Sequence, residues 1–184
     1  LIAVAVLGNG LIWFYSAPPL RLSYNGLGEI AVMLGAGLLL PCMGSFVMLG
    51  NVGGLFWVFL FPCILYALSI IVSVEMPDRE GDCQARRYTL VVRRGRRFGL
   101  VLIALSNLIA TLYLSLISKS NLAKALIDLR LIAIFSLPPL LSGILGIIRR
   151  TEDREPATKL ATLNVYAISS TLLMANCYLI LTLL

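Results

Sequence analysis

Residues 55–74 read LFWVFLFPCILYALSIIVSV, a run of twenty residues without a single charged side chain. A helix of this length spans about 30 Å, which is the thickness of the hydrocarbon core of a bilayer. Lipid offers the backbone no hydrogen-bond partner, whereas a helix satisfies its own amides and carbonyls. The run therefore predicts a membrane-spanning helix from Leu55 to Val74.

Similar apolar runs lie on both sides of this segment. In chain order they cover Leu1–Phe14, Gly28–Met48, Gly99–Ile117, Leu129–Ile148 and Ala161–Leu184. The first is too short for a full crossing, so the sequence predicts an all-α, polytopic transmembrane helix bundle with five full spans and one truncated span. Residues 1–184 form a single membrane domain in this interpretation, because no repeat or low-complexity segment marks a boundary.

The composition of the whole chain is that of a membrane protein. Of its 184 residues, 59% are hydrophobic and only 13% are charged, and a soluble domain could not cover so much apolar side chain. The net charge of +6 would suit nucleic acid in a soluble protein. Here the basic residues lie between apolar runs, as they do in cytoplasmic loops, so we expect a lipid bilayer and no nucleic acid as partner.

Two residue types restrict the chemistry. Histidine is absent, which removes the commonest general base and metal ligand. Cys42, Cys63 and Cys177 lie in apolar runs, only Cys83 lies in a charged segment, and no CxxC pair occurs. Catalysis or metal binding would therefore have to rely on carboxylate, arginine, lysine and tyrosine side chains.

Prolines and glycines occur inside the predicted spans. The prolines predict kinks in a packed bundle, at Pro41, Pro62, Pro138 and Pro139. The glycines predict close approach of neighbouring helices, at Gly35, Gly37, Gly44, Gly143 and Gly146.

The basic residues predict how the chain is oriented in the membrane. Alternating helices place loops 15–27, 76–98 and 149–160 on one side and loops 49–54 and 118–128 on the other. The first side carries twelve Lys and Arg residues and the second carries three. Because basic loops stay in the cytoplasm, we expect the first three loops to be cytoplasmic in a multi-pass protein integral to the plasma membrane.

The segment EMPDREGD places four carboxylates directly after a span, at Glu75, Asp78, Glu80 and Asp82. If the helix continues past Pro77, residues 75, 78 and 82 share one face. Two carboxylates about 6 Å apart repel by roughly 3 kcal/mol at an effective dielectric near 20, and a divalent cation would offset this repulsion. Carboxylates without histidine or cysteine favour Mg²⁺, or Mn²⁺.

The arginines that follow the carboxylates leave two interpretations open. The acids pair with them in a solvated loop, as many surface charges do. Alternatively, the acids hold a metal that binds a polyphosphate, while guanidinium groups bind the remaining oxygens bidentately. Composition does not decide between the two.

The segments YSAPPLRLSYNGLGE, residues 15–29, and EMPDREGD with the following TLVVR, residues 75–82 and 89–93, resemble the UbiA superfamily of intramembrane prenyltransferases. The likeness is closest to the 1,4-dihydroxy-2-naphthoate prenyltransferase branch. That branch commonly has Gly-Lys before Arg-Thr-Leu, where this chain has Arg86, Arg87 and Tyr88, and an Asn where this chain has Val74.

The resemblance matches the helices of this chain, in order, to the fourth through ninth helices of the family. It implies that residues 1–184 are the C-terminal part of the bundle. The first three helices and the first aspartate-rich motif would then be missing, and we expect these residues alone to be inactive.

The resemblance also implies an activity. This is the Mg²⁺-dependent transfer of a polyprenyl group from its diphosphate to an aromatic acceptor such as a quinone precursor, as in menaquinone biosynthesis. By position, the metal-binding catalytic residues would be Asp78 and Asp82, assisted by Glu75 and Glu80. The diphosphate-binding residues would be Arg87, Arg21 and Arg86. Secondary candidates are Tyr15, Tyr24 and Asn25, which membrane-belt positions explain equally well.

Other functions fit the sequence less well. The residues from Asp82 to Arg86 superficially resemble the Asp-Gly-x-x-Ala-Arg element of CDP-alcohol phosphotransferases, but they are one residue short and lack the Gly. A transporter is disfavoured because the span interiors are almost free of ionisable groups. The main alternative is a non-catalytic membrane subunit or a degenerate prenyltransferase with a charged cytoplasmic docking loop. Asparagines within the spans are interpreted as interhelical hydrogen-bonding groups, at Asn107, Asn164 and Asn176.

Overall fold

A computed structural model describes residues 1–119 and 128–183, and every regular element in these two ranges is a helix. In chain order the elements are α1 (Ile2–Ser16), α2 (Gly28–Val32), η1 (Met33–Leu39), α3 (Leu40–Leu49), α4 (Gly54–Gln84), α5 (Leu90–Ile117), α7 (Arg130–Phe135), α8 (Leu137–Arg149) and α9 (Arg154–Leu183). Most of the predicted loop 118–128, with Lys124, and the end of the last predicted span at Leu184 lie outside the described residues.

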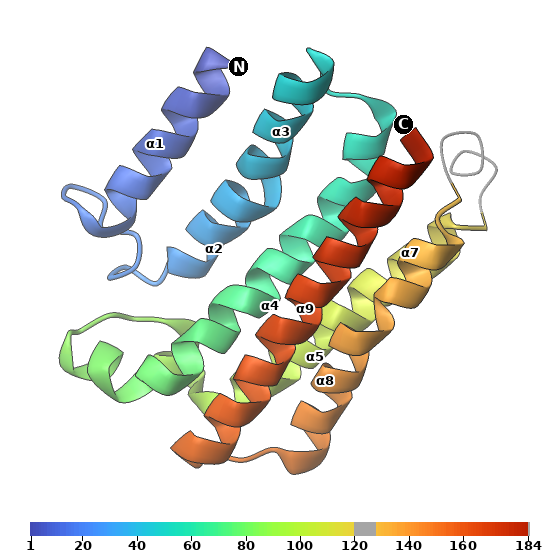
Figure 1. Ribbon diagram of the computed structural model, residues 1–184. Coiled ribbons are helices and arrows are strands. Elements are labelled where there is room, and N and C mark those ends of the chain that lie inside the picture. The colour runs from blue at the N-terminus through green and yellow to red at the C-terminus, as the bar shows by residue number, and fades with distance from the viewer. Residues whose placement is uncertain (120–127, 184) are drawn as a thin grey trace.

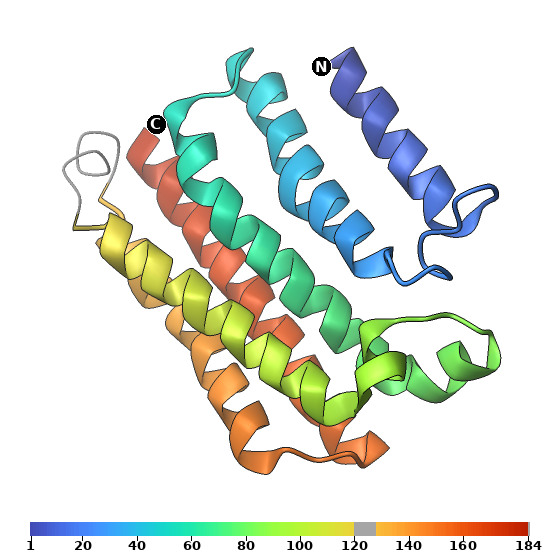
Figure 2. The ribbon, with the colours of Figure 1, turned by 180° about the vertical axis from the view of Figure 1, so that it is seen from behind.

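Five helical stretches are long and apolar enough to cross a membrane, which confirms the predicted polytopic bundle. They are Gly28–Leu49, Gly54–Gln84, Leu90–Ile117, Arg130–Arg149 and Arg154–Thr182, and Ile2–Ser16 is a shorter apolar helix. Helix α4 packs against α5 and α9, and α8 packs against α5 and α9. The segment formed by α2, η1 and α3 lies against α4, and α1 is outermost (Figures 1 and 2).

Several predicted boundaries were wrong, because hydropathy marks only the part of a helix that lies in lipid. Helix α4 does not end at Val74 but continues through Pro77 to Gln84. Helix α5 begins at Leu90 instead of Gly99, and the Thr89 hydroxyl accepts a hydrogen bond from Val92 N at 3.3 Å as its N-cap. The predicted loop 76–98 is therefore mostly helical.

The last two predicted spans also differ from the structure. The span predicted from Leu129 to Ile148 is divided at Ser136, and Pro138 lies in the first turn of α8, where its missing amide hydrogen costs no hydrogen bond. Helix α9 begins at Arg154, seven residues before the predicted Ala161. These seven residues, about two turns, carry charged side chains, which a helix accepts once it has left the lipid.

Pro41 changes the winding of the span that contains it. The seven residues before Leu40 form the π-helical stretch η1. Pro41 has no amide hydrogen and its ring would collide with the carbonyl four residues earlier, so the backbone is wound more widely there. Gly37 in this stretch lies against α4, and a Cβ atom at that position would be 2.7 Å from Ile64 Cα.

The predicted close approaches at glycine are confirmed at some positions. A Cβ atom at Gly143 would lie 2.8 Å from Ala104 Cα, so α8 and α5 are in backbone contact there. Gly44 has no neighbour within 4 Å of such an atom, so the prediction for it was wrong.

A buried polar network joins four helices near the middle of the bundle. Asn107 Nδ2 donates to Asn164 Oδ1 at 2.7 Å, and Ser142 Oγ donates to the same oxygen at 2.9 Å. Asn164 Nδ2 donates to the hydroxyls of Ser69 at 3.0 Å and Ser73 at 2.9 Å. These bonds confirm the interhelical interpretation of the two asparagines.

The third asparagine behaves differently. Asn176 Nδ2 donates to the carbonyl of Leu172 within its own helix, at 2.8 Å, and the side chain is exposed. The interhelical interpretation was therefore wrong for this residue.

Residues 15–29, 75–97 and 149–155 meet at one end of the bundle, which we call the charged end (Figures 1 and 2). Arg93 Nη2 donates to the carbonyl of Gly26 at 3.4 Å. Arg79 Nη1 pairs with Glu152 Oε2 at 3.4 Å. The three basic loops therefore lie on the same side of the membrane bundle.

Candidate active site at the charged end

The continuation of α4 aligns three of its carboxylates. Because the helix runs unbroken to Gln84, Glu75, Asp78 and Asp82 follow one another at helical spacings of three and four residues on one face. Glu75 and Asp82 are buried, with exposed fractions of 5% and 8%, whereas Asp78 is exposed. The face therefore begins inside the protein, reaches the surface at Asp78 and is buried again at Asp82.

Glu75 is the deepest carboxylate of this face, and one of its oxygens has no partner. Oε2 is buried without a hydrogen bond among the described residues. The side chain faces the backbone amide of Val91 and the carboxyl group of Glu29. Glu29 is itself 3% exposed, and its Oε1 accepts a hydrogen bond from Leu90 N. A buried carboxylate oxygen without a donor is a place where a cation or a polar ligand would relieve a desolvation cost.

Guanidinium groups face the Asp82 end of the acidic face. Arg87 Nη1 lies 3.5 Å from Asp82 Oδ1, while its Nε is buried and has no partner among the described residues. The guanidinium carbons of Arg21 and Arg87 lie over the ring of Tyr24, at 5.2 and 5.4 Å from its centroid. A hydrogen bond to Tyr24, and then the charge of Asp82, raise the pKa of Arg87, which keeps it a cation.

Glu80 lies on a different face and has a different partner. Its two carboxylate oxygens accept from Arg96 Nη1 at 2.7 Å and Nη2 at 2.6 Å. Arg96 is 2% exposed, and its Nε also donates to Met76 O at 2.9 Å. The structure therefore does not bring Glu80 to the other three carboxylates and places it in a brace between α4 and α5.

Glu152, in the loop between α8 and α9, completes this brace. Its carboxylate accepts from Arg96 N and Arg97 N, both at 3.1 Å, which are the first amides after a break in α5. The break is at Gly95, with φ 84° and ψ 168°, a conformation that only glycine adopts without strain. The Glu152 side chain thus caps the free amides at the start of the membrane-spanning part of α5.

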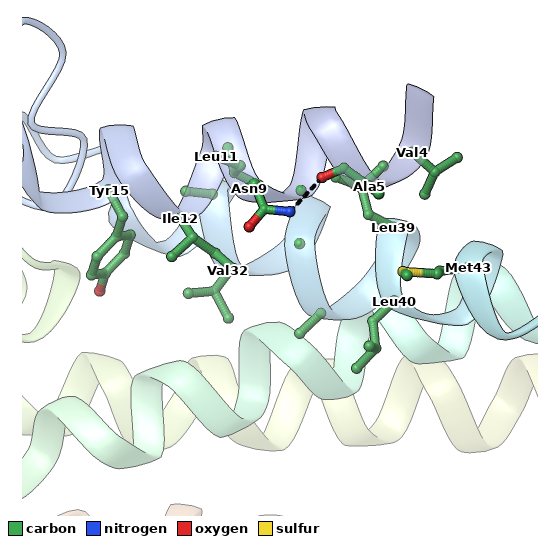
Figure 3. A pocket seen from close by; sticks show the side chains of 14 residues that line it. Val4, Ala5, Asn9, Leu11, Ile12, Tyr15, Val32, Leu39, Leu40 and Met43 are labelled. Carbon is green, nitrogen blue, oxygen red and sulfur yellow. Dashed lines mark hydrogen bonds between the residues drawn. The ribbon is translucent and has the colours of Figure 1, made fainter. Parts of the chain in front are cut away.

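An apolar pocket of about 480 Å³ lies between α1 and the segment from α2 to α3. Its walls are aliphatic except for Asn9, whose Nδ2 is occupied by the Ala5 carbonyl at 2.8 Å, and for Tyr15 (Figure 3). Tyr15 stands at one end of the pocket in Figure 3, and it interacts electrostatically with Glu75, Arg87, Glu29 and Asp82. The pocket therefore ends beside these carboxylates and Arg87.

This arrangement suits an amphiphilic anion. An apolar chain would fit a pocket of this size and lining, and a phosphate group at its head would meet Arg21 and Arg87. No group of three or more carboxylate or cysteine side chains in the described ranges is close enough together to hold a metal ion. Mg²⁺ nevertheless commonly takes only one or two carboxylates and completes its shell with water and substrate phosphate, so a pair such as Asp78 and Asp82 would be enough for such an ion.

Comparison of the sequence with protein families gave a match. The description of the matching family is "UbiA prenyltransferase family", and the match covers residues 1–176. The chain belongs to the UbiA prenyltransferase family. UbiA proteins are membrane enzymes that transfer prenyl groups to aromatic acceptors, and the family normally uses Mg²⁺ held by aspartate-rich motifs. Searches among curated proteins and among solved structures gave no significant match.

Within this UbiA chain, the structure gathers most of the predicted site residues. Tyr15, Tyr24, Arg21 and Arg87 surround the acidic face, as described above. Arg86 is exposed in a left-handed conformation, φ 56°, and its side chain forms no hydrogen bond or ion pair with the described residues. Asn25 is exposed and donates to the carbonyl of Leu20 at 2.6 Å, which is a loop-closing bond.

Sequence reasoning missed three side chains of this region. Glu29, Arg96 and Glu152 are held by contacts 16 to 61 residues away in sequence. Glu29 had one usable signal, because it is an ionisable residue at the very start of an apolar span, where such residues are rare. Neither Arg96 nor Glu152 stands out from the neighbouring charges in the sequence.

Proposed function

We propose that this protein transfers a polyprenyl group from its diphosphate to an aromatic acceptor of the dihydroxynaphthoate type, in an Mg²⁺-dependent reaction. The single observation that carries the proposal is the position of Tyr15, where an apolar pocket meets a cluster of carboxylates and arginines. A prenyl diphosphate has the same division into an apolar chain and a charged head. The family membership supports the reaction class, and the residues resembling the dihydroxynaphthoate branch support the choice of acceptor.

In this proposal, the arginines bind the leaving group. The buried Nε of Arg87 has a hydrogen to donate and no acceptor in the described residues, so a phosphate oxygen would satisfy it. Arg21 would bind a second oxygen, because it shares the ring of Tyr24 with Arg87. Arg86 would contribute only after its side chain turns toward the site.

Asp78 and Asp82 would hold the metal ion, with Glu75 assisting from the buried end of the face. When bound, Mg²⁺ would offset negative charge on the diphosphate. Glu80 would act indirectly, because its pairing with Arg96 fixes how α4 is turned about its axis.

The reaction requires that the allylic carbon–oxygen bond of the diphosphate breaks and that a ring carbon of the acceptor bonds to the allylic carbon. Diphosphate leaves as the carbon–oxygen bond breaks, and the ring loses a proton after the new carbon–carbon bond has formed. Water would capture the allylic cation, and the aliphatic walls of the pocket from Val4 to Met43 keep water away from the prenyl chain.

Two properties of the whole protein stay predictions. One is that residues 1–184 are the C-terminal part of a longer bundle and lack the first aspartate-rich motif. The other is that the charged end faces the cytoplasm from the plasma membrane, which the count of basic residues supports.

The test is prenyl transfer in membranes that contain the protein expressed from its complete reading frame. Dihydroxynaphthoate and a polyprenyl diphosphate are supplied, with Mg²⁺ or with EDTA. We expect prenylated product only with Mg²⁺. If product forms only with a different aromatic acceptor, that acceptor replaces dihydroxynaphthoate in the proposal. No product with any of a small panel of acceptors would favour the non-catalytic docking alternative.

A further inference from the structure

A second hollow lies at the charged end, between the end of α8 and the beginning of α9. Its volume is about 410 Å³, and none of its lining residues belongs to the candidate active site. Arg149, Lys159 and Glu155 line its polar part, and Leu145 and Leu163 line its apolar part. Nothing in the proposed prenyl-transfer reaction uses this hollow.

The polar part of the hollow carries a net positive charge. Arg149 is exposed in the last turn of α8 and forms no ion pair with any described residue. Lys159 Nζ pairs with Glu155 Oε1 at 2.7 Å, but both side chains are largely exposed, Lys159 at 75% and Glu155 at 78%. Two cations and one anion therefore leave one positive charge in the hollow, and the exposed pair is weak enough to be exchanged for another anion.

The apolar part continues as a strip along the outside of the two helices. Leu141, Leu145 and Ile148 are exposed at successive turns of α8, and Leu163 and Tyr166 are exposed on α9. Both helices belong to apolar stretches long enough to span the membrane. The strip therefore leads from the hollow toward the level of the lipid chains.

We propose that this hollow binds the headgroup of an anionic phospholipid, with its phosphate at Arg149 and Lys159 and its acyl chains along the strip. A free phosphate ion would use only the two cations. A zwitterionic phospholipid would use the strip but would gain less from the net charge. Basic hollows between membrane helices at this depth recognise anionic headgroups, and each nearby cation contributes about fivefold to binding.

The experiment uses the purified protein from its complete reading frame in detergent. Dioctanoyl phosphatidylglycerol, dioctanoyl phosphatidylcholine and inorganic phosphate are titrated separately, and binding is measured by native mass spectrometry. We expect phosphatidylglycerol to bind at least about fivefold more tightly than phosphatidylcholine. Arg149→Gln should remove about fivefold of this preference. The control is Arg94→Gln, which makes the same charge change at an exposed arginine that stacks on Phe98 outside the hollow.

A third variant tests the sign of the effect. Glu155→Gln removes the anion of the hollow and frees Lys159, so phosphatidylglycerol should bind about fivefold more tightly than in the unchanged protein. A variant that merely unfolds could not gain affinity. Equal binding of both lipids, equal losses in Arg94→Gln and Arg149→Gln, or displacement of the lipid by millimolar inorganic phosphate would each overturn the proposal. None of these results bears on prenyl transfer.

Discussion

Arg96 and Glu80 are joined by two parallel hydrogen bonds of 2.7 and 2.6 Å, a bidentate geometry in which both side chains are fixed in direction. The third bond of Arg96, to Met76 O, ties the same guanidinium to the α4 backbone one turn earlier. Glu80 follows Asp78 by two residues and so lies on the far side of the helix from it. The brace therefore sets the direction in which the acidic face of α4 points.

Arg96→Met should destabilise the protein by about 2 kcal/mol. Half-exposed Glu80 recovers water, but the Met76 carbonyl loses its charged donor, and such a bond contributes about 1.5–3 kcal/mol. The matched control is Arg97→Met, whose side chain is 65% exposed and 4.0 Å from its partner Glu152. We expect less than about 1 kcal/mol there. Thermal unfolding in detergent measures both, and equal effects would contradict the brace.

Gly95→Ala and Gly81→Ala should have opposite effects on stability. At Gly95, a side chain meets both the positive φ and Glu152 Oε1 at 3.0 Å, so the cost should be about 1–3 kcal/mol. At Gly81, in the exposed end of α4, a Cβ atom has open space, and alanine should stabilise the helix by about 0.5–1 kcal/mol. Chemical unfolding of the two variants side by side tests the prediction, which a stabilising Gly95→Ala would refute.

Asp82→Asn and Asp78→Asn should each lower prenyl transfer by about a hundredfold while leaving membrane insertion unchanged, because charge stabilisation at the leaving group would be lost. Asp153→Asn makes the same change at an exposed position of the same end of the bundle and should retain full activity. Product formation per amount of inserted protein is the measurement. Retained activity in Asp82→Asn would remove this residue from the proposed metal site.

Tyr24→Leu should raise the KM for prenyl diphosphate by about tenfold with little change in kcat, because the ring holds two guanidinium groups before the reaction begins. Tyr24→Phe keeps the ring and loses only the hydroxyl that bonds to Arg87, so its KM should rise less, by about threefold. Steady-state kinetics with a saturating acceptor separate the two parameters. If Tyr24→Phe is as poor as Tyr24→Leu, the hydroxyl group matters and the ring does not.

Asn164→Ala should cost about 2 kcal/mol, since it removes four hydrogen bonds and such bonds in membrane proteins average about 0.6 kcal/mol each. Asn176→Ala makes the same truncation at an exposed side chain whose bond stays within its own helix, and we expect less than about 0.5 kcal/mol. Unfolding in mixed micelles compares them. A similar loss in both would mean that the buried network contributes nothing specific.

The sequence predicted the number and type of spans because lipid imposes one rule on every residue of a span. The run from Leu55 to Val74 is an example. Hydropathy did not predict that the same helix continues through polar residues to Gln84. The alignment of Glu75 with Asp82 also followed from local spacing, once the helix was known to continue past Pro77. Helical periodicity and hydropathy are local properties, so one sequence is enough to use them.

The contacts of the site could not be predicted in this way. Glu80 and Asp82 are two residues apart and chemically alike, yet one binds a buried arginine and the other faces the candidate site. Which of seven arginines in residues 76–98 is buried depends on how α5 crosses α4, and no local pattern distinguishes Arg96 from Arg97. Such assignments require the packing of segments far apart in the chain.

The bond between Glu29 and Leu90 N joins residues 61 positions apart, and this separation has a consequence for biogenesis. A ribosome adds about 5–20 residues per second, so Glu29 is made roughly 3–12 s before Leu90. During that interval the Glu29 carboxylate lacks the Leu90 amide, so the acidic end of the span Gly28–Leu49 keeps its water until α5 is made. This span packs on α4, which is made before α5, but its acidic end is satisfied only when Leu90 has been added. A nascent chain that stalls before Leu90 would therefore hold a packed helix pair with one unpaired carboxylate.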